Sequence, residues 1–373
     1  MIYLDNAATT RPSESCVAAM TDALTKNWAN PSALYHFGVE AARLLRQCRQ
    51  AVADALGAET DRVFFTACGS ESDNWAIFSA AERLGKRGKH IITTAIEHSA
   101  VIKPIKKLEE QGFEVTYLQP DELGRITVES LQAALRKDTI LVSIMMVNNE
   151  SGAVMPIEKM AKLTHRICPN ALFHTDAVQG FFKVPFRART LGADMISVSG
   201  HKVHASKGVG AIYLRPGLQL PPYLLGGGQE GGMRSGTEGL PQIAGFAAVC
   251  AQNLPKRMEH IAHQNRLKTM LQDGLREMEG VTLIGAQDAP HIVNLAVRGL
   301  RSQGLLNGLQ EHGICVSAGS ACSKGHRSRV LEAMEVEGEL IDGSIRVSLC
   351  HESTEEEVKT FLEVLPQVIQ SLR

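Results

Sequence analysis

Between residues 62 and 214, short apolar runs alternate with longer amphipathic stretches, and this alternation constrains the fold more than any other feature. The runs expected to be strands are 62–65, 90–94, 114–118, 140–147, 171–175, 195–198 and 210–214. Stretches such as SESDNWAIFSAAERL, VIKPIKKLEEQ and IEKMAKLTHRI carry apolar residues at helical spacing. Strands that alternate with helices predict an α/β domain, here a mostly parallel seven-stranded sheet sandwiched by helices.

The chain changes character after Leu218. A glycine-rich loop, GGGQEGGMRSGTEG at 226–239, precedes helical patterns at about 241–252 and 257–278. Shorter strand patterns then follow, VTLIG, HIVNLAV, GICVSAG and SIRVSL, before a closing helix. A chain of 373 residues is long enough for two domains. We expect a large domain at 13–260 and a smaller α+β domain built from 1–12 and 261–373.

Composition excludes several classes of function. The 39 Lys and Arg against 40 Asp and Glu give a formal net charge of -1, which favours neither nucleic acid nor membrane as a partner. The N-terminus has no basic stretch followed by an apolar one, so we expect a cytoplasmic, soluble protein. The eight cysteines form no CxxC, and His201 and His204 lack neighbouring acid or Cys ligands. We therefore expect no disulfide framework and no metal site.

Ligands of parallel sheets bind beyond the carboxyl ends of the strands, so the residues after each strand are the candidates. The turn from Thr66 to Glu71 combines Gly69 and Ser70 with an immediately following helix. Free backbone N–H groups and the helix dipole make such a turn a phosphate site, although an ordinary capped helix start would use the same residues. Walker and Rossmann spacings are absent, so a nucleotide is not favoured.

Asp176 and Lys202 follow two successive predicted strands. A carboxylate beside a heterocyclic nitrogen keeps that nitrogen protonated, the interaction that makes pyridoxal phosphate (PLP) an electron sink. A lysine at the end of a buried strand, as in ISVSGHKVHASKGVG, loses water and its pKa falls, which imine formation requires. A helix-capping aspartate and a surface lysine are the simpler interpretations. Packing alone, however, does not explain why an acid at the end of one strand is followed by a lysine at the end of the next.

Three more polar residues stand at or within predicted strands. His98 follows the strand at 90–94, where an imidazole could stack on a ring or shuttle protons, or merely cap a helix. Asn149, in VNNESG, has an amide that could donate to a ring hydroxyl or a carboxylate. Arg346, in SIRVSL, is a guanidinium inside an apolar strand, which suits a substrate carboxylate or a structural salt bridge equally well.

Cys322 is the cysteine whose surroundings best favour a nucleophile. Small residues precede it in VSAGSACSKGHRSRV, and Lys324, His326, Arg327 and Arg329 follow within seven positions. Positive charge stabilises thiolate over thiol. The other cysteines lie in helical, strand or turn patterns, and we expect them to be structural.

The sequence resembles the NifS/IscS-type cysteine desulfurases, PLP enzymes of fold type I in the class V aminotransferase family. The similarity runs nearly end to end through YLDNAATT, NPSALYHFG, FTACGSESDN, EHSAV, VNNESG, HTDAVQ, SGHK, GGGQEGGMRSGT, GSAC and SIRVSL. It implies an enzyme that removes sulfur from L-cysteine, releases L-alanine and holds a persulfide on Cys322. It also implies transfer of that sulfur to an iron–sulfur scaffold or a tRNA thiolation enzyme.

The resemblance assigns roles around the cofactor ring. Lys202 would form the Schiff base with PLP, and Asp176 would pair with the pyridine nitrogen. Gln179 would lie beside the ring hydroxyl and His98 would stack on the ring. Arg346 and Asn149 would bind the substrate carboxylate.

The resemblance also implies how the phosphate is held. The Gly69 amide, Ser70, Ser199 and His201 would bind it within one subunit. Thr237 would reach the phosphate of a second subunit, so the family predicts a homodimer with shared active sites.

Two segments depart from the family's frequent sequences, and other functions stay open. Ala205-Ser206-Lys207-Gly208 replaces a Gly-Pro-Lys-Gly run, and Cys68-Gly69-Ser70 replaces Gly-Ala-Thr, neither of which removes a chemical group. The segment from Cys322 to Arg346 is shorter than in housekeeping members, which leaves the sulfur acceptor open. A selenocysteine lyase or class V aminotransferase is the alternative enzyme. A scaffold protein that lost the chemistry would not keep Lys202, Asp176 and Cys322.

Overall fold

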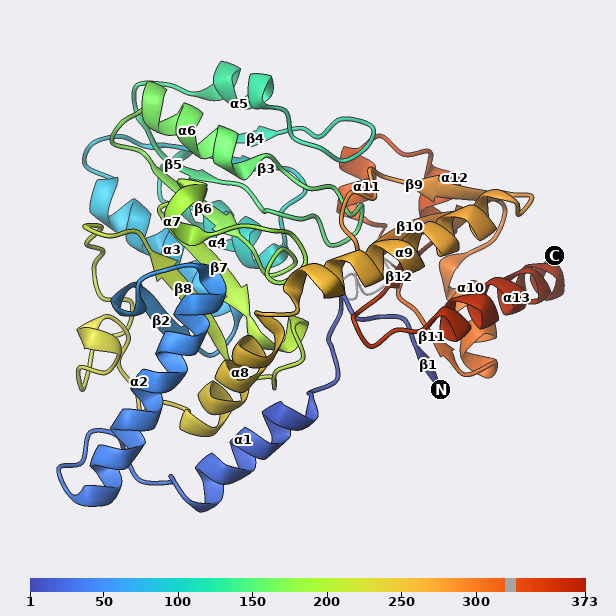
Figure 1. Ribbon diagram of the computed structural model, residues 1–373. Helices are drawn as coiled ribbons and strands as arrows, with labels where there is room; N and C mark the ends of the chain where they lie inside the picture. Colours follow the sequence, from blue (N-terminus) through green and yellow to red (C-terminus); the bar gives the residue numbers. More distant parts are fainter. Residues whose placement is uncertain (319–326) are drawn as a thin grey trace.

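The computed structural model describes residues 1–318 and 327–373. Its largest sheet consists of β2 (Val63–Thr66), β3 (His90–Thr94), β4 (Glu114–Leu118), β5 (Thr139–Ser143), β6 (Leu172–Asp176), β7 (Met195–Ser199) and β8 (Gly210–Leu214). The strand order is β2-β8-β7-β6-β5-β3-β4, and only β8 runs antiparallel to its neighbours. The expected mostly parallel seven-stranded sheet is confirmed (Figure 1).

The strand expected at 140–147 is shorter than its apolar run. β5 ends at Ser143, although the side chains from Ile144 to Val147 are buried. The backbone N–H of Met145 donates to the carboxyl of Glu97 at 2.8 Å. On the β3 side a side chain therefore takes the place of the neighbouring strand, while Ile144 and Met146 still donate to backbone carbonyls of β6. The apolar composition of the run does not reveal this change.

Helices cover both faces of this sheet. One layer contains α3 (Gly69–Leu84) and α4 (Ser99–Glu110). The other contains α1 (Glu14–Thr25), α2 (His36–Leu56), α6 (Ile157–Ile167) and α8 (Leu240–Asn253), with the shorter α5 (Val128–Ala134) and α7 (Ala188–Leu191) nearby.

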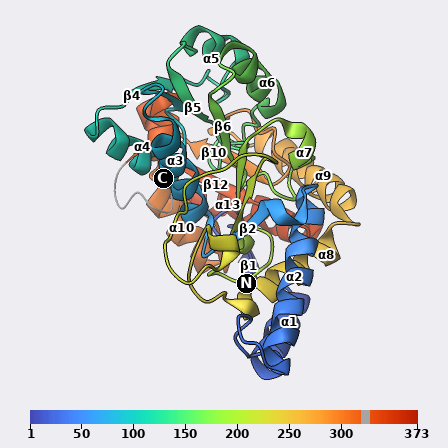
Figure 2. The ribbon, with the colours of Figure 1, turned by 90° about the vertical axis from the view of Figure 1, so that its left-hand side faces the viewer.

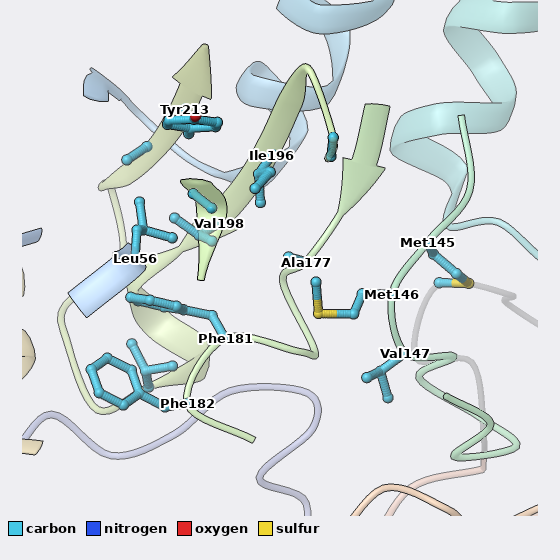
Figure 3. Close-up of a cluster of buried hydrophobic side chains, with 14 of the residues drawn as sticks. Leu56, Met145, Met146, Val147, Ala177, Phe181, Phe182, Ile196, Val198 and Tyr213 are labelled. Carbon is cyan, nitrogen blue, oxygen red and sulfur yellow. The ribbon is translucent and has the colours of Figure 1, made fainter. Parts of the chain in front are cut away.

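Alternate residues of each strand pack into these two layers, because side chains of a strand point to opposite faces. Met195 packs in the cluster that includes Trp75 of α3. Ile196 packs on the other face, where Figure 3 shows Ile196 and Val198 near Leu56 of α2.

The remaining elements gather at one end of the molecule. The strands β9 (Val281–Ile284), β10 (Ile292–Val297) and β12 (Ser344–Ser348) form an antiparallel sheet in the order β12-β10-β9, and β1 (Ile2–Tyr3) pairs parallel with β11 (Ile314–Cys315). Their helices are α9 (Arg257–Arg276), α10 (Ser302–Glu311), α11 (Arg329–Ala333), α12 (Gly338–Asp342) and α13 (Glu355–Leu372). Both termini lie at this end, and α9 runs toward it from the large sheet (Figures 1 and 2). In the described ranges, no helix has the length and apolar character needed to cross a membrane.

Backbone segments approach closely at Gly210, where β8 pairs with both β2 and β7. A Cβ atom there would lie 2.8 Å from the carbonyl carbon of Cys68 and 2.8 Å from the carbonyl oxygen of Val198. Both are backbone atoms, which cannot rotate away. The glycine therefore allows the turn after β2 to sit against the end of β7.

We predict that Gly210→Ala lowers the free energy of unfolding by about 1–3 kcal/mol, the usual cost of overpacking. Gly304→Ala in α10 is the matched control, because its Cβ would meet Leu372 at an ordinary 3.4 Å. That control should be neutral or stabilising by up to about 1 kcal/mol through helix propensity. Denaturant unfolding measures both, and equal stability of the two variants would contradict the prediction.

Candidate active site

The carboxyl ends of the central strands open into a cavity of about 600 Å³. Among the residues lining it are Gly69, Ser70, His98, Asn149, Asp176, Gln179, Ser199, His201, Lys202 and Arg346. Thr237 is exposed and does not line this cavity. Cys322 lies outside the described residues. The structure thus brings together the predicted site residues with these two exceptions.

Lys202 ends the short 3-10 helix η2 (Gly200–Lys202), which directly follows β7. Its Nζ donates hydrogen bonds to the backbone carbonyls of Ala7 and Ala8, each at 2.7 Å. Burial, helped by the positive charge of Arg346, lowers the pKa of Lys202 to about 8. A substantial neutral fraction of the amine is therefore present near neutral pH, and the neutral amine is the nucleophilic form.

Asp176 is the last residue of β6 and lies on the same cavity as Lys202. Its Oδ1 accepts a hydrogen bond from the backbone N–H of Val178 at 2.9 Å. Burial raises the pKa of Asp176 to about 7, and the neighbouring Asp73 acts in the same direction. A cationic ring nitrogen beside this carboxyl would favour its ionised form. Acid and amine therefore share one site, as the sequence predicts.

The N-terminus of α3 has the groups that an anion requires. The helix is 16 residues long and begins at Gly69, where a Cβ atom would lie 2.7 Å from Cγ2 of Val178. Ser199 Oγ is buried and has no hydrogen-bond partner among the residues described. An unpartnered hydroxyl beside free helix N–H groups fits the phosphate of PLP. Burial also lowers the pKa of His201 to about 4, so this neighbour is neutral.

His98 and Gln179 are held in place by hydrogen bonds. His98 precedes α4, and its Nδ1 accepts from the backbone N–H of Ala100 at 3.2 Å. Burial lowers the pKa of His98, so the ring is neutral with its proton on Nε2. Gln179 donates to the carbonyl of Ala7 at 2.8 Å, and its Oε1 lies 3.1 Å from Nε2 of His291.

The guanidinium of Arg346 in β12 has two hydrogen-bond partners and one nitrogen without a partner. Its Nη1 donates to the backbone carbonyl of Asn149 at 2.7 Å, and its Nη2 donates to Asp5 at 2.8 Å. Its Nε is buried and without a partner in the described part of the chain. The salt bridge considered from the sequence is thus present, and a donor remains for a substrate anion. Asn149 contacts Arg346 through its backbone carbonyl.

Three buried acids in this cavity, Asp73, Glu97 and Glu150, were not found from the sequence. Glu97 accepts hydrogen bonds at Oε1 from the backbone N–H of Met145 (2.8 Å) and the hydroxyl of Thr94 (2.9 Å). Its Oε2 has no partner within residues 1–318 and 327–373. Burial raises the pKa of Glu97 to about 8 and that of Asp73 to about 7. The available signal for Glu97 was an acid inside the apolar stretch TTAIEHSAV.

The described residues contain no cluster of three or more His, Cys, Asp or Glu side chains that could hold a metal ion. The cysteines described are all free thiols, and most of them are buried. Burial raises the pKa of several, including Cys48, Cys250 and Cys350. These buried thiols are poor nucleophiles.

Comparisons with known proteins identify the family of this chain. The model of the aminotransferase class-V family matches residues 2–361. A cysteine desulfurase of Nostoc sp. is 39% identical over 378 residues, covering 100% of this chain and 94% of that protein. A solved NifS-like protein superposes with a TM-score of 0.94 at 36% identity and 100% coverage of both chains. A structure of SspA in complex with cysteine has a TM-score of 0.82 at 32% identity, covering 95% of this chain and 100% of that one.

This chain belongs to the aminotransferase class-V family and has the fold type I of PLP-dependent enzymes. Cysteine desulfurases of this family depend on PLP, and PLP is the cofactor of this chain. The resemblance stated from the sequence is confirmed at the level of family, fold and cofactor.

We predict that Glu97→Gln makes the unfolding free energy less dependent on pH. A carboxyl whose pKa rises from 4.5 to about 8 on folding loses stability as the pH rises between those values, because its proton is retained only in the folded state. The neutral amide lacks this penalty. The unfolding free energy of the variant should therefore exceed that of the wild type by about 1–3 kcal/mol at pH 8 and by less at pH 5. Denaturant unfolding at both pH values measures the difference. The exposed Glu122→Gln is the control, and a constant offset for Glu97→Gln at both pH values would contradict the prediction.

Proposed function

We propose that this chain is a cysteine desulfurase that converts L-cysteine to L-alanine and keeps the sulfur as a persulfide on Cys322. The observation that carries the proposal is the shared cavity of Lys202 and Asp176 beside the N-terminus of α3. An amine with a lowered pKa, a buried acid and an anion site are the three features that PLP requires. Full-length relatives named cysteine desulfurase support the same activity.

Two groups of residues would hold the cofactor. Gly69, Ser70, Ser199 and His201 would bind its phosphate, with Thr237 contributed by a second subunit. Asp176 would pair with the ring nitrogen, Gln179 would contact the ring hydroxyl and His98 would stack on the ring. When bound, PLP supplies an electron sink next to the carbon that carries the substrate amine.

Arg346 and Lys202 act on the substrate amino acid. The guanidinium binds the substrate carboxylate, for which its unpartnered Nε remains available. This contact orients the α-hydrogen toward the amine of Lys202. With a pKa near 8, Lys202 can take that proton and later return it.

Cys322 takes the sulfur. Its thiolate attacks the substrate sulfur, a sulfur–sulfur bond forms and the carbon–sulfur bond of the substrate breaks. The electron pair of the broken bond stays with the substrate carbon, which takes up a proton to give alanine. The sulfur leaves the site as the Cys322 persulfide. An aminotransferase would have no use for such a thiol.

Described residues next to the Cys322 segment either line the cavity or pair with a residue that does. Ser317 exchanges two backbone hydrogen bonds with Arg346, at 3.1 and 2.6 Å. Arg327 and Arg329, which follow the segment, line the cavity wall. The positive charge of Arg329 would favour the thiolate form of Cys322, whereas the charge of Arg327 is paired with Asp342.

The active assembly in this proposal is a cytoplasmic homodimer. Each subunit has a large domain at 13–260 and a smaller one from 1–12 and 261–373. Large apolar side chains are exposed at Trp28 (70%), Leu34 (95%) and Leu225 (88%). Exposed apolar groups of this size are typical of an interface, and Leu225 shares its loop with Thr237. A protein of iron–sulfur assembly or tRNA thiolation would accept the sulfur.

We expect Lys202→Ala and Cys322→Ser to fail in different ways. Purified wild type should show the absorbance band of the PLP–lysine imine and release sulfide from cysteine with a reductant. Lys202→Ala should lose the band, whereas Cys322→Ser should keep it and release sulfide at least about 100-fold more slowly. Absorbance spectra and sulfide assays measure both. Unchanged sulfide release by Cys322→Ser would refute the assigned nucleophile.

The homodimer is tested with Leu34→Glu. A buried, unpaired carboxylate at the interface should shift the protein from dimer to monomer in light scattering. The monomer should also bind PLP more weakly, because Thr237 would no longer reach the partner's phosphate. Met258→Glu, on the exposed side of α9, is the control and should stay dimeric. A wild type that is monomeric at micromolar concentration would contradict this assembly.

A further inference from the structure

Lys183 is a buried lysine that the reaction described above does not use. Its side chain is 6% exposed, and it stands in the turn after β6. Its Nζ donates a hydrogen bond to the backbone carbonyl of Lys202 at 2.7 Å. In the described structure this carbonyl is its one hydrogen-bond acceptor, and no carboxylate forms a salt bridge with it.

The titratable groups around Lys183 are neutral or cationic. Cys350 follows β12, His291 precedes β10, and His204 and His351 pack against each other with ring centroids 4.3 Å apart. Glu352 approaches His204 at 3.8 Å, but that carboxylate is half exposed. Burial lowers the pKa of Lys183 to about 8. Lys183 is therefore not half of a buried ion pair, and its specific contact is with Lys202.

We propose that Lys183 is a positioning residue that fixes the backbone of Lys202 and, in its protonated form, adds a positive charge near the Lys202 amine. The inference rests on the proposed function, in which Lys202 is the reactive amine. Lys202 is held at both ends, because Ala7 and Ala8 accept from its Nζ while Lys183 donates to its carbonyl. The amine can therefore leave the two N-terminal carbonyls while the turn that carries it stays in place.

The charge of Lys183 also acts on the amine of Lys202. Burial and Arg346 are the larger causes of the lowered pKa of Lys202, and Lys183 adds to them. Asp5 and Asp176 act in the opposite direction. The imidazoles of His98, His201 and His291 also lie close enough to interact with Lys202, and burial holds all three neutral. Removing the Lys183 charge should therefore raise the pKa of the nitrogen at Lys202.

The experiment compares two buried lysines. Lys268 in α9 is 9% exposed and donates to the backbone carbonyls of Gln287 (3.0 Å) and Ala289 (3.2 Å), away from the cavity. Full-length Lys183→Met and Lys268→Met are loaded with PLP, and the absorbance band of the PLP–lysine imine is titrated with pH. Lys183→Met should raise the titration midpoint by roughly half a unit, and Lys268→Met should leave it unchanged. Lys183→Arg, which keeps the charge, should titrate near the wild type.

An unchanged midpoint in Lys183→Met overturns the proposal. Equal shifts in Lys183→Met and Lys268→Met would also overturn it, since loss of any buried lysine would then suffice. If Lys183→Met does not fold, Lys183→Gln removes the same charge with a polar side chain and must raise the midpoint. Absence of the band in the wild type would instead refute the proposed function. In that case the effect of Lys183 on the pKa of the Lys202 amine is measured in cofactor-free protein, from the pH dependence of acetylation at Lys202.

Discussion

The structure depends on removing the amine of Lys202 from water without giving it a strong anionic partner. The Nζ is bound by two neutral carbonyls, those of Ala7 and Ala8. A carboxylate at the same distance would stabilise the ammonium and raise its pKa. Carbonyl oxygens fix its position at a smaller electrostatic gain, so burial prevails and the pKa falls to about 8. The reactivity of the lysine thus follows from which acceptors surround it.

The N-terminal segment supplies those acceptors and links the parts of the site. Asp5 pairs with Arg346, Ala7 accepts from Gln179, and Thr10 hydrogen-bonds the carbonyl of His201. Residue 5 and residue 346 are 341 positions apart in the chain. The segment therefore couples the position of Arg346 to that of the Lys202 amine. A shift of either end would move groups on both sides of the cavity.

Much of this arrangement could be predicted from the sequence, for identifiable reasons. Strands β3, β4 and β8 were predicted at their observed bounds because alternation with helices and flanking turns defines them locally. Asp176 and Lys202 were predicted because parallel strands end at one edge. The carbonyls of Ala7, Ala8 and Asn149 could not be predicted, because backbone acceptors have no residue signature.

The contacts of Asp5 and Lys183 could not be predicted from the sequence either, because tertiary packing determines both. The end of β5 at Ser143 could not be predicted either, because the next backbone N–H on the β3 side, that of Met145, donates to the carboxyl of Glu97. Local patterns thus predict which chemical groups arrive at the site. The long-range contacts that hold those groups in place need the three-dimensional structure.

The buried acids complete the electrostatics of the cavity. Glu97, Asp73 and Asp176 lie close enough that their charges interact, and three ionised carboxylates there would repel one another. Burial raises the pKa of both Glu97 and Asp176, so each carboxyl favours its protonated form when no cation is near. A cation beside Asp176 would favour its ionised form. In the proposed function, that cation is the protonated ring nitrogen, and Asp176 is the carboxyl that would pair with it.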